Sequence, residues 1–150
     1  MSPFNLTDSA EIILSAIGAN FIAQFYKFIV FLLVNKQINF KRLFQTGGMP
    51  SSHSSFTMAM TTSTGLITGF DSAPFAIAFT ISLIVMYDAA GLRRAVGKQA
   101  SVLNQIVTEV FSGHPNLSSQ RFRELLGHTP VEVFIGALLG TAVAGWIHKF

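Results

Sequence analysis

Residues 47–70 read GGMPSSHSSFTMAMTTSTGLITGF. The Pro-Ser-Ser string at 50–52 is typical of a helix start, because a serine at the cap accepts a hydrogen bond from a free amide of the first turn. Residues 51–70 are long enough to cross a bilayer, which takes ~17–25 residues. The hydroxyls disfavour contact with lipid and predict the inner helix of a bundle. They belong to Ser54, Ser55, Thr57, Thr61, Thr62, Ser63, Thr64 and Thr68.

The composition of the whole chain indicates a membrane protein. Of its 150 residues, 50% are hydrophobic and only 11% are charged, a balance outside the usual soluble range. We therefore expect one all-α membrane domain over residues 1–150, an integral membrane helical bundle with about four transmembrane helices. The four apolar stretches lie at about residues 9–34, 51–70, 74–90 and 130–149.

The first and last apolar stretches carry polar or small residues that bear on packing. Asn20, Gln24 and Lys27 interrupt the first stretch, which is compatible with one helix or with a short helix followed by a spanning one. Gly136 and Gly140 have the GxxxG spacing, which lets another helix approach closely, either within the chain or in a homodimer.

The long polar connection at 92–129 contains apolar residues at helical spacing. This pattern predicts an amphipathic helix that lies at the membrane interface or against the bundle. We expect a second, short helix at about 119–126, ended by Gly127. The apolar residues of the pattern are Val102, Leu103, Ile106, Val107, Val110 and Phe111.

The basic residues predict the orientation in the membrane. If the apolar stretches alternate in direction, eight of the ten Lys and Arg residues fall on one side, which the positive-inside rule makes cytoplasmic. Asp8 and Glu11 precede the first apolar run, where a signal peptide would be basic, so we expect this helix to be retained. The chain has no cysteine, which excludes disulfides and thiolate chemistry. The eight residues are Lys36, Lys41, Arg42, Arg93, Arg94, Lys98, Arg121 and Arg123.

Three polar clusters are expected on that same side, and the first lies around His53. Gly47 and Gly48 let the backbone approach an anion, and the free amides after Ser51 and Ser52 favour negative charge. His53 could protonate a leaving oxygen. In the alternative interpretation, Pro-Ser-Ser is an ordinary helix cap and His53 an interfacial histidine.

The second cluster contains Asp88, Arg93, Arg94 and Lys98. An unpaired carboxylate at the membrane boundary is costly, so Asp88 pairs with Arg93 or Arg94 in the simplest interpretation. The two guanidinium groups and Lys98 carry more positive charge than one aspartate neutralises. The planar guanidinium groups suit bidentate hydrogen bonding to phosphate.

The third cluster is the string Gly-His-Thr-Pro-Val-Glu at 127–132. Glu132 lies four residues after His128, so its carboxylate can orient the imidazole and make His128 a candidate nucleophile. Thr129 and Glu132 also fit a capping box with Pro130 in the first helical position, and the two roles are compatible. We expect His114 and His148 to be surface residues.

Together, three strings resemble the divergent bacterial and plastid branch of the type 2 phosphatidic acid phosphatase and vanadium haloperoxidase superfamily. They are GGMPSSHS at 47–54, YDAAGLRRAVGKQA at 87–100 with Leu103-Asn104, and LGHTPVEV at 126–133. The resemblance implies that His53 is the general acid, His128 the nucleophile that attacks phosphorus, and Glu132 the carboxylate that orients it.

The resemblance also implies a membrane phosphatase that hydrolyses a lipid phosphate or a polyprenyl pyrophosphate. The reaction would proceed through a phosphohistidine and would need no metal and no cofactor. The substrate would be a phosphorylated lipid, the partners membrane lipids, and no nucleic acid would be bound. The membrane would be a bacterial plasma membrane or a plastid membrane. From the basic residues and the helix start, rather than from the resemblance, we expect the phosphate to be bound by Arg42, Ser51, Ser52, Arg93, Arg94 and Lys98.

The chain departs from the superfamily motifs at several positions. Ser52 stands in place of a glycine, Glu132 in place of an aspartate, and Phe122 where the motif arginine would be. These departures keep a second hypothesis open, a non-catalytic membrane protein that binds anionic lipid or a partner through the same basic face. A small transporter with Lys27 and Asp88 as intramembrane charges is a third.

Overall fold

A computed structural model of the chain describes residues 6–38, 40, 48–110 and 127–149. The regular elements of these ranges are helical, as the sequence predicts, and the first apolar stretch forms one continuous helix. The short helix expected at 119–126 lies outside the described residues. The α-helices are α1 (Leu6–Asn35), α2 (Ser52–Thr68), α3 (Ala73–Ala90), α4 (Leu92–Val110) and α6 (Pro130–Ile147).

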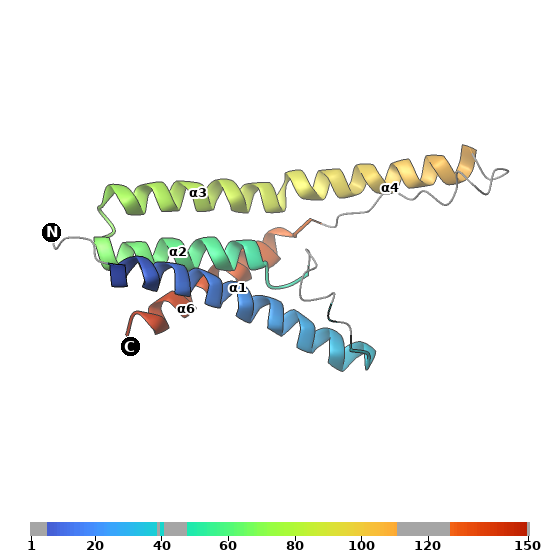
Figure 1. The fold of residues 1–150 in the computed structure, drawn as a ribbon. Helices are drawn as coiled ribbons and strands as arrows, with labels where there is room; N and C mark the ends of the chain where they lie inside the picture. Colours follow the sequence, from blue (N-terminus) through green and yellow to red (C-terminus); the bar gives the residue numbers. More distant parts are fainter. Residues whose placement is uncertain (1–5, 39, 41–47, 111–126, 150) are drawn as a thin grey trace.

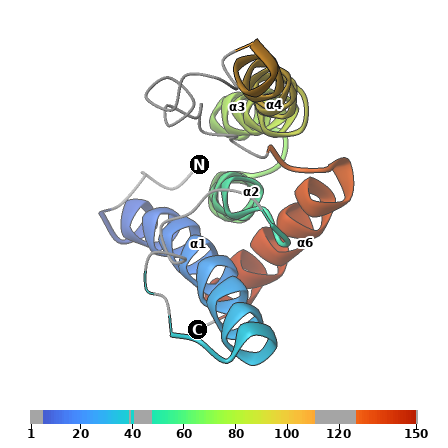
Figure 2. The same cartoon turned by 90° about the vertical axis from the view of Figure 1, so that its right-hand side faces the viewer.

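The hydroxyl-rich helix α2 is the centre of the bundle. It packs against α1, α3 and α6, and Figure 2 shows it enclosed by these helices. Nine of its 17 residues are buried, and seven of the nine are serines or threonines. The prediction that this helix is the inner element is therefore confirmed.

Three helical segments are long and apolar enough to cross a membrane: Thr7–Asn35, Ala73–Glu109 and Pro130–Ile147. The expected count was about four, and the fourth expected span corresponds to α2, which is shorter and is lined by hydroxyls. The segment Ala73–Glu109 has 37 residues, about twice what a ~30 Å hydrocarbon core requires at 1.5 Å per residue. A large part of α4 must therefore extend beyond the hydrocarbon core.

The predicted amphipathic helix is α4, and it begins earlier than its apolar pattern. It continues the direction of α3 beyond Gly91, so that the two form a long rod in Figure 1. Among the described elements, α4 contacts α3 and no other helix. Its apolar side chains Val96, Leu103 and Ile106 are exposed.

The core consists of small residues, and the large apolar side chains lie outside. Ala19, Ala59 and Ala144 are fully buried, whereas aromatic and branched residues of α1, α3 and α6 are exposed. This arrangement suits a bundle in lipid, where large apolar groups need no protein cover and small residues let helices approach. Between α2 and α3, the hydroxyls of Thr61 and Ser82 lie 2.7 Å apart. Thr61 also donates to the Ala78 carbonyl at 3.1 Å.

Gly136 and Gly140 form the contact between α6 and α2. A methyl group added to Gly136 would collide with the carbonyl oxygen of Ser51, and one added to Gly140 with that of Ser55. The GxxxG pair therefore serves packing within the chain. An added methyl at Gly145, in the same helix, meets no atom within 4 Å.

We expect Gly140→Ala to lower the free energy of unfolding by about 1–3 kcal/mol, because the new methyl forces α6 away from the α2 backbone. The matched control is Gly145→Ala, which should leave stability unchanged or raise it by up to about 1 kcal/mol through helix propensity. Thermal unfolding in detergent micelles, followed by the fluorescence of Trp146, measures both. Equal stability of the two variants would contradict this packing.

Candidate functional site

The first and third polar clusters meet at the end of the bundle where α2 and α6 begin and α3 ends (Figure 1). Two backbone hydrogen bonds hold these ends together. The amide of Ser51 donates to the carbonyl of Glu132 at 3.0 Å, and the amide of His128 donates to the carbonyl of Ala89 at 3.1 Å. Residues from three distant parts of the chain are thereby fixed beside one another.

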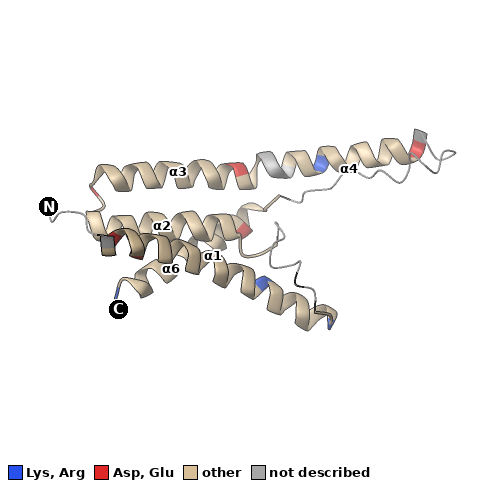
Figure 3. Cartoon of the chain, viewed as in Figure 1, with Lys and Arg blue, Asp and Glu red and all other residues tan. Residues whose placement is uncertain are grey.

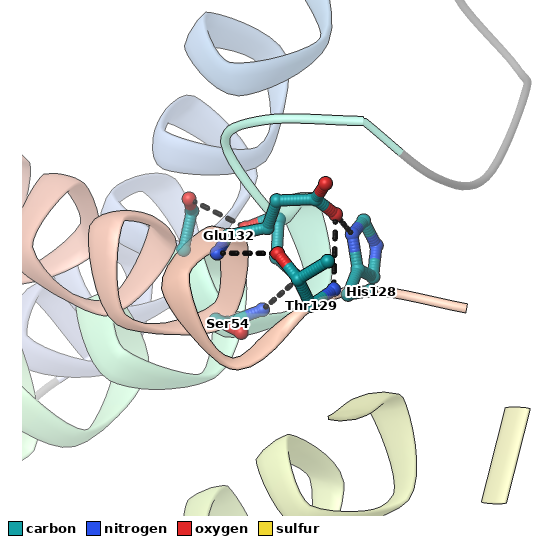
Figure 4. A network of polar contacts seen from close by, with 6 residues as sticks. Ser54, His128, Thr129 and Glu132 are labelled. Carbon is teal, nitrogen blue, oxygen red and sulfur yellow. Dashed lines mark hydrogen bonds and ion pairs between the residues drawn. The ribbon is translucent and has the colours of Figure 1, made fainter. Parts of the chain in front are cut away.

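His128 and Glu132 form the centre of this site. Nδ1 of His128 lies 2.9 Å from Oε2 of Glu132, and only 2% of the histidine side chain is exposed (Figure 4). Since a carboxylate accepts hydrogen bonds, this contact fits an Nδ1–H donor.

The capping box that the sequence allows is present as well. Oε2 of Glu132 accepts from the Thr129 amide at 3.3 Å, and Oγ1 of Thr129 accepts from the Glu132 amide at 3.3 Å. A single carboxylate oxygen therefore serves both the helix cap and the histidine. Glu132 thus makes both the predicted helix cap and the predicted contact with His128.

The second histidine comes from the first turn of α2. The ring centroids of His53 and His128 lie 6.1 Å apart, with an interplanar angle of 66°. Nε2 of His128 is buried and has no hydrogen-bond partner among the described residues. The pair thus brings two imidazoles together, and Nε2 of His128 is not hydrogen-bonded by any described group.

Ser51 and Ser52 are both buried at the start of α2. Oγ of Ser51 accepts from the Ser54 amide at 3.4 Å, so this serine is the helix cap. The Ser51 carbonyl accepts from the Ser55 hydroxyl at 2.9 Å. Ser51 therefore fulfils the ordinary capping role, at the position where a phosphate cradle was also predicted.

The predicted cationic residues are only partly described. Arg42 lies outside the described residues, as do the side chains of Arg93 and Arg94, whose backbones belong to the first turn of α4. Lys98 is exposed on α4, and Asp88 is half-buried near the end of α3. The proposed pairing of Asp88 with an arginine is thus a prediction about undescribed side chains.

One charged residue near the site was not assigned to it from the sequence. Lys27 of α1 is half-buried, and a Cβ built on Gly48, just before the start of α2, would lie 3.6 Å from its Cδ. In the sequence, Lys27 interrupts an apolar stretch, and the only role considered for it was that of an intramembrane charge in a transporter. The available signal was the general rule that an ionisable residue within a spanning helix has a partner.

His148 lies at the other end of α6, where Nδ1 is 2.8 Å from Oε1 of Glu11. The same carboxylate oxygen accepts from the Ser63 hydroxyl at 3.5 Å. His148 is thus a surface residue, as expected, and it also joins α6 to α1. Within the described ranges, no three His, Asp or Glu side chains are arranged to hold a metal ion.

Comparisons with known proteins identify the family of the chain. Residues 9–143 match the model of the Divergent PAP2 family. A membrane protein of Bacillus subtilis strain 168, named uncharacterized membrane protein YuiD, is 37% identical over 139 residues, which cover 85% of this chain and 87% of that protein. No solved structure matches the chain. The resemblance inferred from the motifs is confirmed, and the chain belongs to the Divergent PAP2 family.

Proposed function

We propose that this membrane protein is a phosphatase that hydrolyses a lipid phosphate or a polyprenyl pyrophosphate, with His128 as nucleophile and His53 as general acid. The observation that carries the proposal is the buried His128, whose Nδ1 faces Glu132 at 2.9 Å while Nε2 has no partner among the described residues. This arrangement leaves a lone pair on Nε2 directed away from the orienting carboxylate.

The reaction would proceed in two displacements. In the first, Nε2 of His128 forms a bond to phosphorus, the bond from phosphorus to the leaving oxygen breaks, and that oxygen takes a proton from His53. In the second, His53 takes a proton from water, the water oxygen attacks phosphorus, and the bond between phosphorus and nitrogen breaks. Phosphate is released and both histidines return to their starting state.

Phosphate binding in this proposal relies on the start of α2 and on the basic residues. The amides after Ser51 and Ser52 favour an anion, and Arg42, Arg93, Arg94 and Lys98 would supply positive charge. A reacting phosphorus must come within about 3–3.5 Å of the nucleophile. Because Nε2 is buried, substrate entry requires the side chains around His128 to move apart. We assign the site to the cytoplasmic face from the positive-inside rule.

A second candidate function is supported by the capping box. Glu132 and His128 tie α6 to the ends of α2 and α3 through bonds that need no substrate. In this alternative the cluster is structural, and the basic face binds anionic lipid without hydrolysis. Phospholipid binding without phosphate release from any lipid phosphate would favour it.

We expect His128→Ala and His53→Ala each to lower phosphate release by at least about 10²-fold, because one lacks the nucleophile and the other the acid. Phosphate release by purified protein across a panel of lipid phosphates and pyrophosphates measures this, with vanadate and a chelator as added arms. The matched control is His148→Gln, which removes a histidine from the opposite end of the bundle. Wild-type turnover in His128→Ala would contradict the nucleophile assignment.

Thr129→Ala separates the cap from the chemistry. Loss of the cap hydroxyl should lower the free energy of unfolding by about 1 kcal/mol, while Glu132 keeps its contact with His128 and phosphate release at low temperature persists. Thr129→Ser, which retains the hydroxyl, is the control. Loss of phosphate release in a folded Thr129→Ala protein would show that the cap geometry is itself required for turnover.

A further inference from the structure

We propose that the exposed apolar face of α4 binds the same face of a second copy of this chain, so that two α4 helices pair in parallel as a short coiled coil outside the hydrocarbon core. The proposal goes beyond the proposed function and holds whether or not the protein is a phosphatase. It gives the homodimer a surface other than the GxxxG pair, because Gly136 and Gly140 already pack α6 against α2 within one chain.

The exposed face of α4 has the spacing of a coiled-coil seam. Its residues follow one another at intervals of three, four and three, which is the period at which one stripe of a helix keeps meeting a partner helix. In the sequence, Leu92 and Val110 extend the stripe by an interval of four at each end. The four exposed residues that define this face, which we name the α4 seam, are Val96, Gln99, Leu103 and Ile106.

The apolar side chains of the α4 seam are not covered within the chain. Val96 is 43% exposed, Leu103 44% and Ile106 49%. Gly97 and Ala100, on another face of the same helix, are buried. No described helix other than α3 contacts α4. A contiguous apolar patch of this kind marks a surface that binds something.

The direction of α4 argues against the bilayer surface as the cover. An amphipathic helix binds a membrane surface by lying in its plane. In contrast, α4 continues the line of α3 in Figure 1, and α3 belongs to a segment that is long and apolar enough to cross the membrane. The α4 seam therefore points along a rod that leaves the membrane, into water, where its apolar side chains are stabilised by a protein surface.

A second copy presents the matching surface at the matching height. Two chains inserted the same way in one membrane are related by a two-fold axis along the membrane normal, so each seam residue meets its own counterpart. Residues 99–108 include no charged residue, and Figure 3 shows this part of α4 without blue or red. Identical seams can therefore approach without repulsion between like charges.

Anchorage by α3 compensates for the shortness of the seam. The helix α4 has 19 residues, fewer than three heptads, and isolated helices of this length are marginal in water. Because α3 holds each α4 at the same height and in the same direction, pairing takes place at a high effective concentration. Gln99 is the one polar residue of the α4 seam, and a single polar residue within a seam favours one register and one number of strands.

The absence of cysteine from the chain makes disulfide cross-linking a direct test. Val96→Cys and Leu103→Cys each place one thiol in the seam. Gln105→Cys, the matched control, places one at an exposed position about 200° around the helix from residue 103. A disulfide forms only when the two Cα atoms come within about 7 Å. Each protein would be reconstituted in vesicles of phosphatidylcholine and phosphatidylglycerol, oxidised with copper phenanthroline, and separated by electrophoresis without reductant.

We expect Val96→Cys and Leu103→Cys to form a disulfide-linked dimer and Gln105→Cys to remain monomeric. Absence of the dimer from both seam variants would overturn the proposal, as would equal cross-linking of all three. Quenching of a fluorophore attached at Leu103→Cys by brominated lipid would also overturn it, because the bilayer would then cover the seam.

A second comparison tests the association without a cross-link. Leu103→Asp should lower the share of dimer at least about 10-fold, because it places two like charges opposite each other in the seam. Gln105→Asp adds the same charge outside the seam and should keep the wild-type share. Single-molecule photobleaching of protein labelled at its C-terminus, in the same vesicles, counts the copies. An equal share of dimer in the two aspartate variants would contradict pairing through the α4 seam.

Discussion

The close approach of α6 to α2 determines where both histidines lie. Gly136 and Gly140 leave no side chain between α6 and the carbonyls of Ser51 and Ser55, so the two backbones meet directly. At that separation the Ser51 amide reaches the Glu132 carbonyl, and the first turns of α2 and α6 lie side by side. His53, in the first turn of α2, therefore faces the histidine that precedes α6. Any wider spacing would separate the proposed acid from the proposed nucleophile.

Small and hydroxyl-bearing residues make this spacing possible and also set the polarity of the interior. Ser55 and Thr61 of α2 donate to the carbonyls of Ser51 and Ala78, and Ser82 of α3 donates to the carbonyl of Thr57. These bonds satisfy polar groups that lipid cannot. The large apolar side chains are left to face outward. An interior of this kind leaves only 2% of the His128 side chain exposed, so its contact with Glu132 gains strength from the low local polarity.

Much of this arrangement could be predicted from the sequence because it depends on local patterns. Hydropathy located the helices, the hydroxyls identified α2 as the inner one, and the spacing of His128 to Glu132 predicted their contact. Two features depend on long-range packing and could not be found that way. The direction of α4, which continues α3, is not encoded in its own amphipathic pattern. The place of Lys27 beside Gly48 requires α1 to pack against α2. The cationic phosphate ligands remain a prediction from motifs.

A covalent intermediate on His128 is the most direct test of the proposed chemistry. Protein in micelles would be mixed with a lipid phosphate carrying ³²P and quenched in alkali, in which phosphohistidine survives, and the labelled peptide would be identified by mass spectrometry. The account predicts label on His128 that appears during turnover, is lost on acid treatment and is discharged by excess unlabelled substrate. Turnover without label on His128, or label on a different residue, would contradict it.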